Sequence, residues 1–343
     1  MLVLIYKNNL DHLLKPLTFH FSTLVTYHSP PCGGGVGGRA FWGFLFFLYM
    51  NIAAIDIGSN GARLLIKSFD DNAPESSRIR KLLFIRIPLR LGKDVFALGK
   101  ISKERQRMML HMMKGFNEFM QLYNVEHFRA CATSAMRDAE NGKKVMRRIE
   151  KATGISLEII PGAEEAQLLC NNLVENTAST EGNYAYVDVG GGSTEISLLH
   201  DGILAESHSF NVGTLRMLAG AVTQEERNAM CRMLEKYAEE FPGTRIIGSG
   251  GNINRLFKLS HAKGDSRTLP VDTLKQLYAE LAPLSIEERM QQYKLKDDRA
   301  DVIIPAAEIF LLVARSLKCN EILVPNISLA DSIVDGIYKK NKE

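Results

Sequence analysis

Two short stretches of this sequence combine an aspartate, a run of glycines and a serine directly after an apolar run. In the first, Asp56 precedes Gly58–Gly61, and in the second, Asp188 precedes Gly190–Thr194. A glycine turn lets several backbone N–H groups point at one phosphate without side chains in the way. A single such turn commonly only reverses the chain, so the occurrence of two is the informative observation. Together they predict a cleft that holds phosphate groups from two sides.

The candidate phosphate-binding residues lie in both turns, in a third glycine turn before a predicted helix, and at two arginines. Backbone N–H groups and guanidinium forks both match phosphate oxygens. For the arginines, solvation at the surface is the competing interpretation, and the third turn is as typical of packing as of binding. The candidates are Gly58, Ser59, Asn60, Arg63, Arg137, Gly190, Gly191, Gly192, Thr194, Gly248, Gly250 and Gly251.

Three carboxylates, Asp56, Asp188 and Glu195, are predicted at strand ends beside the two turns. Clustered carboxylates near phosphates typically hold Mg²⁺, and other divalent cations fit the same ligands. A hydrolase also needs a base that takes a proton from water. Glu164 and Glu165 open a predicted helix, where acidic residues are common because they stabilise the helix dipole. Spacing alone favours that interpretation, and Glu195 alone also fits an exposed strand position.

The elements that carry these residues follow an α/β pattern from Asn51 onward, and the pattern occurs twice. Strands at 52–57 and 63–68 flank the first turn, and strands at 184–189 and 195–199 flank the second. The chain therefore divides into two similar halves. Further strands are expected at 128–132, 157–160, 245–247 and 321–324, and further helices at 102–123, 134–153, 163–174, from 252, at 273–281, at 305–317 and from 329.

The helix expected over 102–123 has Ser102 as its N-cap, because a serine before an apolar repeat is a common helix start. Its apolar residues recur every three or four positions, which predicts one buried face. The methionines in this repeat indicate core packing. The residues of the predicted face are Met108, Met112, Phe116, Phe119 and Leu122.

The first 49 residues differ in composition from the rest, with a glycine-rich run at 32–39 and an aromatic run at 41–49. The apolar part is about ten residues long, well below the roughly 20 that span a bilayer. We expect translation to start at Met50 and residues 1–49 to be a non-native or disordered extension. A polar linker at 175–183 then separates an N-terminal domain at 50–178 from a C-terminal domain at 179–328. A C-terminal helix at 329–343 is free to pack back on the first domain.

Charge and cysteine usage exclude several classes of protein. The formal net charge is +3, of which +2 lies in residues 1–49. A nearly neutral body predicts neither a duplex nucleic-acid partner nor an anionic membrane partner. The five cysteines are far apart and form no CxxC pair. This pattern argues against a disulfide framework and a zinc cluster, and it favours a reducing cytoplasm.

Six segments of the chain, taken together, resemble the exopolyphosphatase and guanosine pentaphosphate phosphohydrolase (Ppx/GppA) family. They occur in the order and with the spacing of that family and span essentially everything from Met50 onward. The segments lie at 54–66, 132–141, 159–169, 187–198, 246–256 and 299–309.

The resemblance implies two ribonuclease H-like domains of the actin-like ATPase (ASKHA) superfamily, with the active site in the cleft between them. It implies that Glu165 is the catalytic base, which reverses the interpretation from spacing alone. Asp188, Ser193 and Glu195 match catalytic and metal-associated positions of the family's second phosphate motif, and Asp56, Gly58, Ser59 and Asn60 match its first phosphate motif. The implied reaction is hydrolysis of terminal phosphoanhydride bonds, assisted by Mg²⁺.

The sequence also departs from the family pattern. Gly61 stands where serine is frequent, Ala306 where glycine is common, and 328–331 lacks an arginine often found there. About 294 residues follow from Met50, which leaves no room for the additional helical domains of longer members. A short two-domain form favours short-chain polyphosphate or guanosine pentaphosphate as substrate, and the sequence ranks neither above the other. A homodimer is one oligomeric state left open.

Two other functions use similar residues. An ATP-dependent kinase of the same superfamily would also carry aspartate-glycine turns, but it needs an aspartate base for an acceptor hydroxyl, and the segment at 162–166 contains glutamates instead. A non-catalytic sensor would bind an alarmone or polyphosphate in the cleft without hydrolysis. Release of phosphate without an acceptor separates the hydrolase from both.

Overall fold

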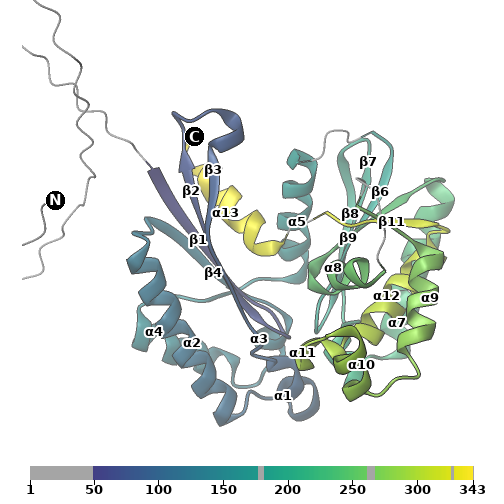
Figure 1. Ribbon diagram of the computed structural model, residues 1–343, viewed down its shortest axis with the longest axis horizontal. Coiled ribbons are helices and arrows are strands. Elements are labelled where there is room, and N and C mark those ends of the chain that lie inside the picture. Colours follow the sequence, from purple (N-terminus) through teal and green to yellow (C-terminus); the bar gives the residue numbers. More distant parts are fainter. Residues whose placement is uncertain (1–48, 177–180, 261–266, 326–327, 343) are drawn as a thin grey trace, which may run out of the picture. The chain divides into compact units, whose positions relative to one another are not determined.

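Two β-sheets organise the part of the chain that the computed structural model describes, residues 49–176, 181–260, 267–325 and 328–342 (Figure 1). The first sheet has the strand order β3-β2-β1-β4-β5. Its first three strands are antiparallel neighbours, and β4 and β5 continue parallel to β1. The strands are β1 Tyr49–Ile57, β2 Ala62–Asp70, β3 Ile79–Ile87, β4 His127–Ala132 and β5 Glu158–Ile159.

The second sheet repeats this arrangement and adds one edge strand, in the order β10-β11-β9-β6-β7-β8. Again a three-stranded antiparallel meander is followed by parallel strands, here β9 and β11 beside β6. The predicted internal repeat is therefore confirmed. The strands are β6 Asn183–Val189, β7 Thr194–His200, β8 Ile203–Phe210, β9 Arg245–Ser249, β10 Thr268–Pro270 and β11 Glu321–Leu323.

Helices cover both faces of each sheet. In the first half, α2 and α4 pack on one face of β1 and β2 through a core that contains Ile55, Leu64 and Phe116, and α5 and α13 cover the other face. The helices of this half are α1 Leu91–Leu98, α2 Lys103–Leu122, α3 Ser134–Asp138, α4 Gly142–Thr153 and α5 Gly162–Asn176, with a 3₁₀ turn at Glu75–Ser77.

The second half has its own core, in which α7, α9 and α12 surround strands β6, β9 and β11. No helix of the described residues is long and apolar enough to cross a membrane. The helices are α6 Thr214–Leu218, α7 Gln224–Glu240, α8 Gly250–Leu259, α9 Val271–Leu281, α10 Ile286–Tyr293, α11 Asp297–Ala300, α12 Ile303–Ser316 and α13 Leu329–Lys340.

The last helix, α13, follows the second sheet in sequence but packs against β1 and β2 of the first half. The buried Lys67 of β2 holds it there, with its ammonium 3.1 Å from a carboxylate oxygen of Asp331 and 2.9 Å from one of Asp335. Such a pair must be well formed, because an unpaired buried charge is costly. The start of α13 thereby comes close to the region between the two sheets.

Two details of the predicted helices are wrong. In α2, Met112 and Phe116 are buried as expected, but Leu122 is 72% exposed and Met108 and Phe119 are also exposed. The buried face instead combines Met112 and Phe116 with Met109, Met113 and Met120. Adjacent methionines fit two overlapping helical repeats equally well, so spacing chose the wrong one. The predicted cap is confirmed, since Ser102 Oγ accepts a hydrogen bond from the Arg105 N–H (3.3 Å).

The second error is the single helix expected over 134–153, which divides into α3 and α4. Between them the side chain of Asn141 bonds both to the N–H of Ile101 (2.9 Å) and to its carbonyl (2.8 Å). These bonds draw the chain out of helical geometry and satisfy backbone groups of a neighbouring loop.

The expected extension at 1–49 lies outside the described residues except for Tyr49, and 177–180 of the expected linker also lie outside them.

Candidate active site

The two glycine turns close in the same way. After β1, the Gly58 N–H donates to the Gly61 carbonyl (3.1 Å), and after β6, the Gly190 N–H donates to the Ser193 carbonyl (2.9 Å). In each hairpin an aspartate lies one residue before the strand's end. The structure therefore confirms that the two motifs occupy equivalent positions.

The turns also lie against each other, because glycine leaves the space. A Cβ atom on Gly191 would lie 3.0 Å from the Cβ of Ser59 and 3.2 Å from the backbone nitrogen of Asn60. A Cβ atom on Gly192 would lie only 2.4 Å from Ser134 Oγ. Absence of a side chain at these positions is what allows the backbones to approach.

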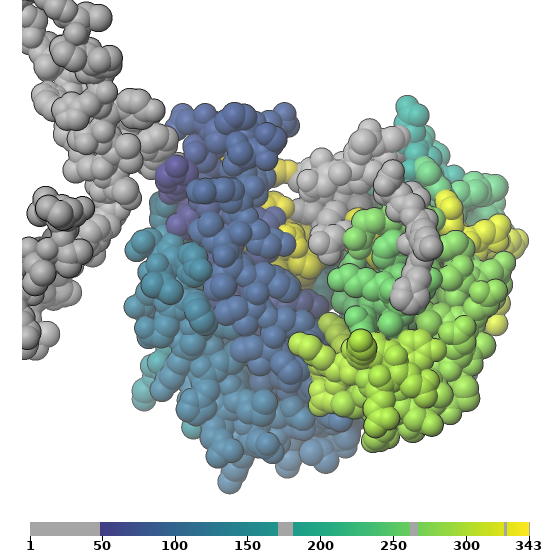
Figure 2. Space-filling model, in the orientation of Figure 1, coloured from purple at the N-terminus to yellow at the C-terminus, as the bar shows by residue number. Residues whose placement is uncertain are grey.

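A pocket lies where the turns meet, with an empty volume of about 610 Å³ that includes space open to solvent. It is lined by both turns, by the start of α8 and by side chains from both halves. Figure 2 shows the surfaces of the two halves in contact, and hydrogen bonds such as Asn60 Nδ2 to the Asp298 carbonyl (3.1 Å) join them. Of the predicted site residues, the pocket is lined by Asp56, Gly58, Ser59, Asn60, Arg63, Glu165, Asp188, Gly190, Gly191, Ser193, Glu195, Gly250 and Gly251.

Glu165 reaches the pocket from the first turn of α5. Its carboxylate is buried, and Oε2 has no hydrogen-bond partner among the described residues. Burial, followed by the charges of Glu195, Asp56 and Asp188, raises the pKa of Glu165 well above its ordinary value. A buried carboxylate oxygen that lacks a hydrogen-bond partner and has a raised pKa is the kind of group that can take a proton from a water molecule.

The approach of α5 to the second sheet depends on Gly162. A Cβ atom there would lie 2.2 Å from Ser209 Oγ and 3.8 Å from Glu195 Oε1. Ser209 in turn donates to Glu195 Oε1 (2.9 Å). A glycine at the start of the helix therefore lets Glu165 come close to the carboxylates of the second half.

Asp188 and Glu195 face each other across the β6–β7 hairpin. Burial raises the pKa of Asp188 to about 6, which the charge of Arg63 opposes. Burial also raises the pKa of Glu195 to about 7, and hydrogen bonds from Ser193 and Ser209 oppose that rise. Both carboxylates thus lack full compensation of their negative charge.

The corresponding pair in the first hairpin is neutral overall. Asp56 is opposite Arg63 in the β1–β2 register, and the two side chains form an ion pair. Burial lowers the pKa of Arg63, but the negative charges of Asp56 and then Asp188 have the larger combined effect, so the pKa of Arg63 is raised overall. Arg63 therefore lies between the two turns with carboxylates on both sides.

Four predicted residues lie outside the lining of the pocket: Arg137, Gly192, Thr194 and Gly248. Thr194 Oγ1 donates to the Val212 carbonyl and is buried. Gly248 packs against the side chains of Ile253, Ile322 and Phe310, each about 3 Å from a hypothetical Cβ atom. Close packing of β9 against α8 and α12 explains this glycine without a ligand, so the packing interpretation of the third turn holds at Gly248, while Gly250 and Gly251 do line the pocket.

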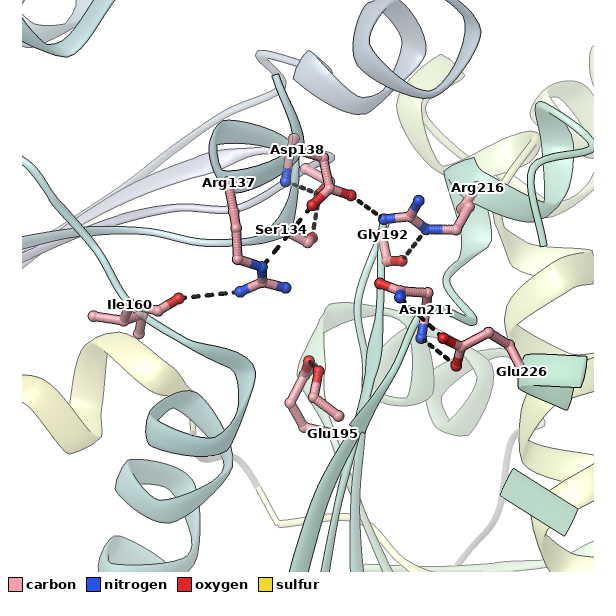
Figure 3. Close-up of polar contacts among 12 residues, drawn as sticks. Ser134, Arg137, Asp138, Ile160, Gly192, Glu195, Asn211, Arg216 and Glu226 are labelled. Atoms are coloured by element: carbon pink, nitrogen blue, oxygen red, sulfur yellow. Dashed lines mark hydrogen bonds and ion pairs between the residues drawn. The ribbon is translucent and has the colours of Figure 1, made fainter. Parts of the chain in front are cut away.

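Arg137 and Gly192 also lie at the edge of the site. The guanidinium of Arg137 donates to the Ile160 carbonyl (3.0 Å; Figure 3). Its positive charge opposes the rise in the pKa values of Glu165 and Glu195. Gly192 is packed between the two halves, as described above. Neither residue is among those that line the pocket.

Sequence reasoning missed part of the basic side of the pocket. Arg86 lies at the end of β3 and its guanidinium is 2.6 Å from the buried Asp298 carboxylate. Arg299 donates to Asn252 Oδ1 (2.7 Å), and burial, aided by the charges of Arg86 and Arg63, lowers the pKa of Arg299 to about 9. Arg299 lies inside one of the recognised segments, whereas nothing in the spacing of β3 points to Arg86. The other unexpected lining residues are Gly61, Thr133, Ser134, Val189, Asn252 and Leu329.

The fit to a divalent metal ion rests on two carboxylates. Within the described residues no group of three His, Cys, Asp or Glu side chains is placed to hold a metal ion. Mg²⁺, however, is commonly held by one or two carboxylates together with substrate phosphates and water. Asp188 and Glu195 are buried, hard oxygen donors with uncompensated charge, so they fit such an ion, whereas Asp56 is already paired with Arg63.

Comparison with known families decides the family of the chain. Residues 74–341 match the model of the Ppx/GppA phosphatase family. The chain belongs to the Ppx/GppA phosphatase family. The curated guanosine-5'-triphosphate,3'-diphosphate pyrophosphatases of Aeromonas salmonicida and Aeromonas hydrophila are each similar at 23% identity over 303 residues, which is 85% of this chain. This Ppx/GppA chain spans about 60% of the length of those relatives.

Solved structures of the family share the fold. The Ppx/GppA family member of Aquifex aeolicus is 25% identical with a TM-score of 0.67, over 85% of this chain and 99% of that one. An exopolyphosphatase from Cytophaga hutchinsonii is 24% identical with a TM-score of 0.74, over 85% and 98%. The fold is thus shared with these Ppx/GppA structures, and the expected α/β architecture of two similar halves is confirmed, with one of the sheets described above in each half.

Proposed function

We propose that this chain hydrolyses terminal phosphoanhydride bonds of short inorganic polyphosphate or of guanosine pentaphosphate. One observation carries the proposal: the buried, unpaired Oε2 of Glu165 lies in the same pocket as two facing glycine turns and three arginines. The turns and the arginines suit an anion with several phosphate groups, and the glutamate suits the activation of water.

The proposed reaction is an in-line attack of water on the terminal phosphoryl group. Glu165 in its ionised form accepts the proton of that water at Oε2, and the raised pKa makes this carboxylate a stronger base than an exposed one. Backbone N–H groups of the turns, with Arg63, Arg86 and Arg299, hold the phosphate oxygens and oppose charge that develops on them. Hydrolysis of this kind needs positioning and electrostatic stabilisation more than covalent chemistry.

Asp188 and Glu195 are the proposed ligands of Mg²⁺ or a similar divalent cation, with Asp56 as a further candidate that first has to leave Arg63. When bound, the ion would offset negative charge on the phosphate oxygens. Ser193 supports Glu195 by a hydrogen bond in its charged form. A cation at this place would also remove the mutual repulsion of the two buried carboxylates.

The two proposed substrates follow the names of the relatives. Some are named guanosine-5'-triphosphate,3'-diphosphate pyrophosphatases and another an exopolyphosphatase. Cytoplasmic location remains the proposed compartment, and it agrees with the four described cysteines being free. The proposal includes no duplex nucleic-acid or membrane partner, and the oligomeric state stays a separate question.

The test is release of phosphate from three substrates in parallel: short polyphosphate, long polyphosphate and guanosine pentaphosphate, each with and without Mg²⁺. We expect release from the first or the third without any acceptor, and a strong loss of rate when Mg²⁺ is removed by a chelator. Release only in the presence of an acceptor hydroxyl would favour a kinase. Binding of these anions without release would favour a sensor and contradict the proposal.

A further inference from the structure

The second glycine turn is backed by the short helix α6. Along the turn, the Thr214 N–H donates to the Gly190 carbonyl (3.0 Å) and the Leu215 N–H donates to the Gly191 carbonyl (2.8 Å). The third carbonyl, that of Gly192, accepts from Nε of Arg216 (2.7 Å), which Figure 3 shows. Three successive carbonyls of the turn therefore point toward α6.

This arrangement determines where the N–H groups of the turn point. In a trans peptide the carbonyl of one residue and the N–H of the next point in opposite directions. The N–H groups of Gly191, Gly192 and Ser193 accordingly point away from α6. Within the described residues none of these three N–H groups donates a hydrogen bond. Gly191 and Ser193 line the pocket, so their N–H groups are available there as donors for an anion.

Arg216 differs from the other two donors of α6 because it is a side chain that reaches the other half of the molecule. Its guanidinium forms an ion pair with Asp138 of α3 and lies over the ring of Phe96, 4.2 Å from the ring centre. Only 12% of the Arg216 side chain is exposed. One guanidinium thus fixes the last peptide of the turn relative to two residues of the first half.

We propose that Arg216 is a positioning residue for phosphate: it turns the Gly192 carbonyl away from the pocket so that the Ser193 N–H faces the substrate, and its contacts with Asp138 and Phe96 support the guanidinium in that position. This rests on the proposed function of the pocket as a phosphate site. The contact also ties the phosphate-binding turn to the first half, which carries Glu165.

The decisive comparison is between loss of the arginine and loss of its ion-pair partner. Arg216→Gln removes the Nε–H bond to Gly192, whereas Asp138→Asn leaves that bond in place. We expect Arg216→Gln to weaken tripolyphosphate binding roughly 10–100-fold, the range for a hydrogen bond in a charged site. Asp138→Asn should weaken it by less than about fivefold, because Asp138 is partly exposed.

Binding is measured by calorimetry in the Glu165→Gln background, so that turnover does not interfere, and kcat and KM are measured in the otherwise unchanged chain. Arg216→Lys keeps the positive charge near Asp138 but lacks the guanidinium geometry, and it should resemble Arg216→Gln. Millimolar guanidinium chloride, but not sodium chloride, should restore binding to Arg216→Ala. Glu226→Gln, which alters the bonds to Asn211 beside the same turn, serves as the control and should change nothing.

If Arg216 only joins the two halves, Arg216→Gln and Asp138→Asn will have equal effects and Arg216→Lys will restore binding. That result overturns the inference, as does failure of the wild-type chain to bind tripolyphosphate. Melting temperatures of all variants identify losses that come from unfolding. A wild-type chain that binds tripolyphosphate through Arg216 but releases no phosphate would leave this inference standing and refute the proposed hydrolysis.

Discussion

The two glycine hairpins of this chain share a backbone and differ in charge. Both close with an N–H to carbonyl bond across the turn, and both place an aspartate opposite a charged residue of the next strand. Asp56 faces Arg63 and is neutralised by it, whereas Asp188 faces Glu195, and burial raises the pKa values of both of these carboxylates. The same backbone arrangement thus carries a charge-balanced pair in the first hairpin and two uncompensated carboxylates in the second.

This difference suggests a division of work within one pocket. The first hairpin brings Arg63 toward Arg86 and Arg299, and these arginines form a basic side of the pocket. Burial and the charges of Arg86 and Arg63 lower the pKa of Arg299, so a bound anion would stabilise its charged form. The second hairpin provides an acidic side that a cation would complement. A phosphate chain with a bound divalent ion carries both kinds of charge.

The largest difference should appear when each aspartate is neutralised. We expect Asp188→Asn to lower kcat/KM by about 10²–10³-fold, because it removes a proposed ligand of the divalent ion. Asp56→Asn should cost less than about tenfold, since Asp56 is paired with Arg63 and the variant leaves that arginine for the substrate. Steady-state kinetics with a Mg²⁺ titration measure both, and equal losses would contradict the division of work.

The next test concerns stability. Arg63→Gln leaves the carboxylate of Asp56 buried and unpaired, which should lower the free energy of unfolding by about 3–5 kcal/mol. Glu195→Gln removes a charge from the uncompensated side and should be neutral or stabilising in metal-free buffer. Urea denaturation of both variants against the wild-type chain gives the comparison. A destabilising Glu195→Gln would show that the second hairpin is compensated after all.

The pH dependence of stability has a definite sign. The folded-state pKa values of Asp188 and Glu195 lie near 6 and 7, above those of an unfolded chain. Their contribution to stability is complete below about pH 4 and is lost as pH rises through 6 and 7, by roughly 3 kcal/mol for each as an upper bound. The melting temperature of metal-free protein should therefore fall between about pH 5 and pH 8. Added Mg²⁺ should reverse part of this fall, and Glu195→Gln should reduce it.

The smallest expected effect compares two glycines. Gly192→Ala places a methyl group against Ser134 Oγ and the Phe96 ring, at 2.4 and 2.5 Å, and should cost about 1–3 kcal/mol through overpacking. Gly58→Ala meets only a carbonyl oxygen at 3.4 Å and should be tolerated within about 0.5 kcal/mol. Thermal unfolding of both variants tests this. Equal tolerance would mean that the turns need not lie in contact.

Much of this arrangement could be predicted from local sequence. Strands, turns and the repeated order of elements follow from apolar runs that end in glycines, so β1, β2, β6 and β7 lie close to where they were expected. The buried face of α2 could not be chosen, because adjacent methionines satisfy two helical repeats. Which of these methionines are buried depends on which face of α2 packs against α4 and the sheet, and the local sequence does not determine that.

The residues of the site also divide into those that local sequence predicts and those that depend on distant partners. Residues within the turns were predictable because the chemistry of a glycine turn is local. Arg86 and Arg216 were not, since each acts through a partner far away in sequence, Asp298 for Arg86 and Asp138 for Arg216. Glu165 was identified by resemblance alone, and its burial and unpaired oxygen now provide a physical reason for that assignment.

The most direct test of the account compares two neighbouring glutamates of α5. Glu165 is buried in the pocket, whereas the Glu164 side chain is 40% exposed and is paired with Arg129 at 2.7 Å. We predict that Glu165→Gln lowers kcat for phosphate release by about 10²–10⁴-fold, the usual contribution of a general base, and that Glu164→Gln leaves it within about twofold, as expected for an exposed ion pair. A loss of less than tenfold in Glu165→Gln, with the protein folded and substrate bound, would contradict the assignment of Glu165 as the base.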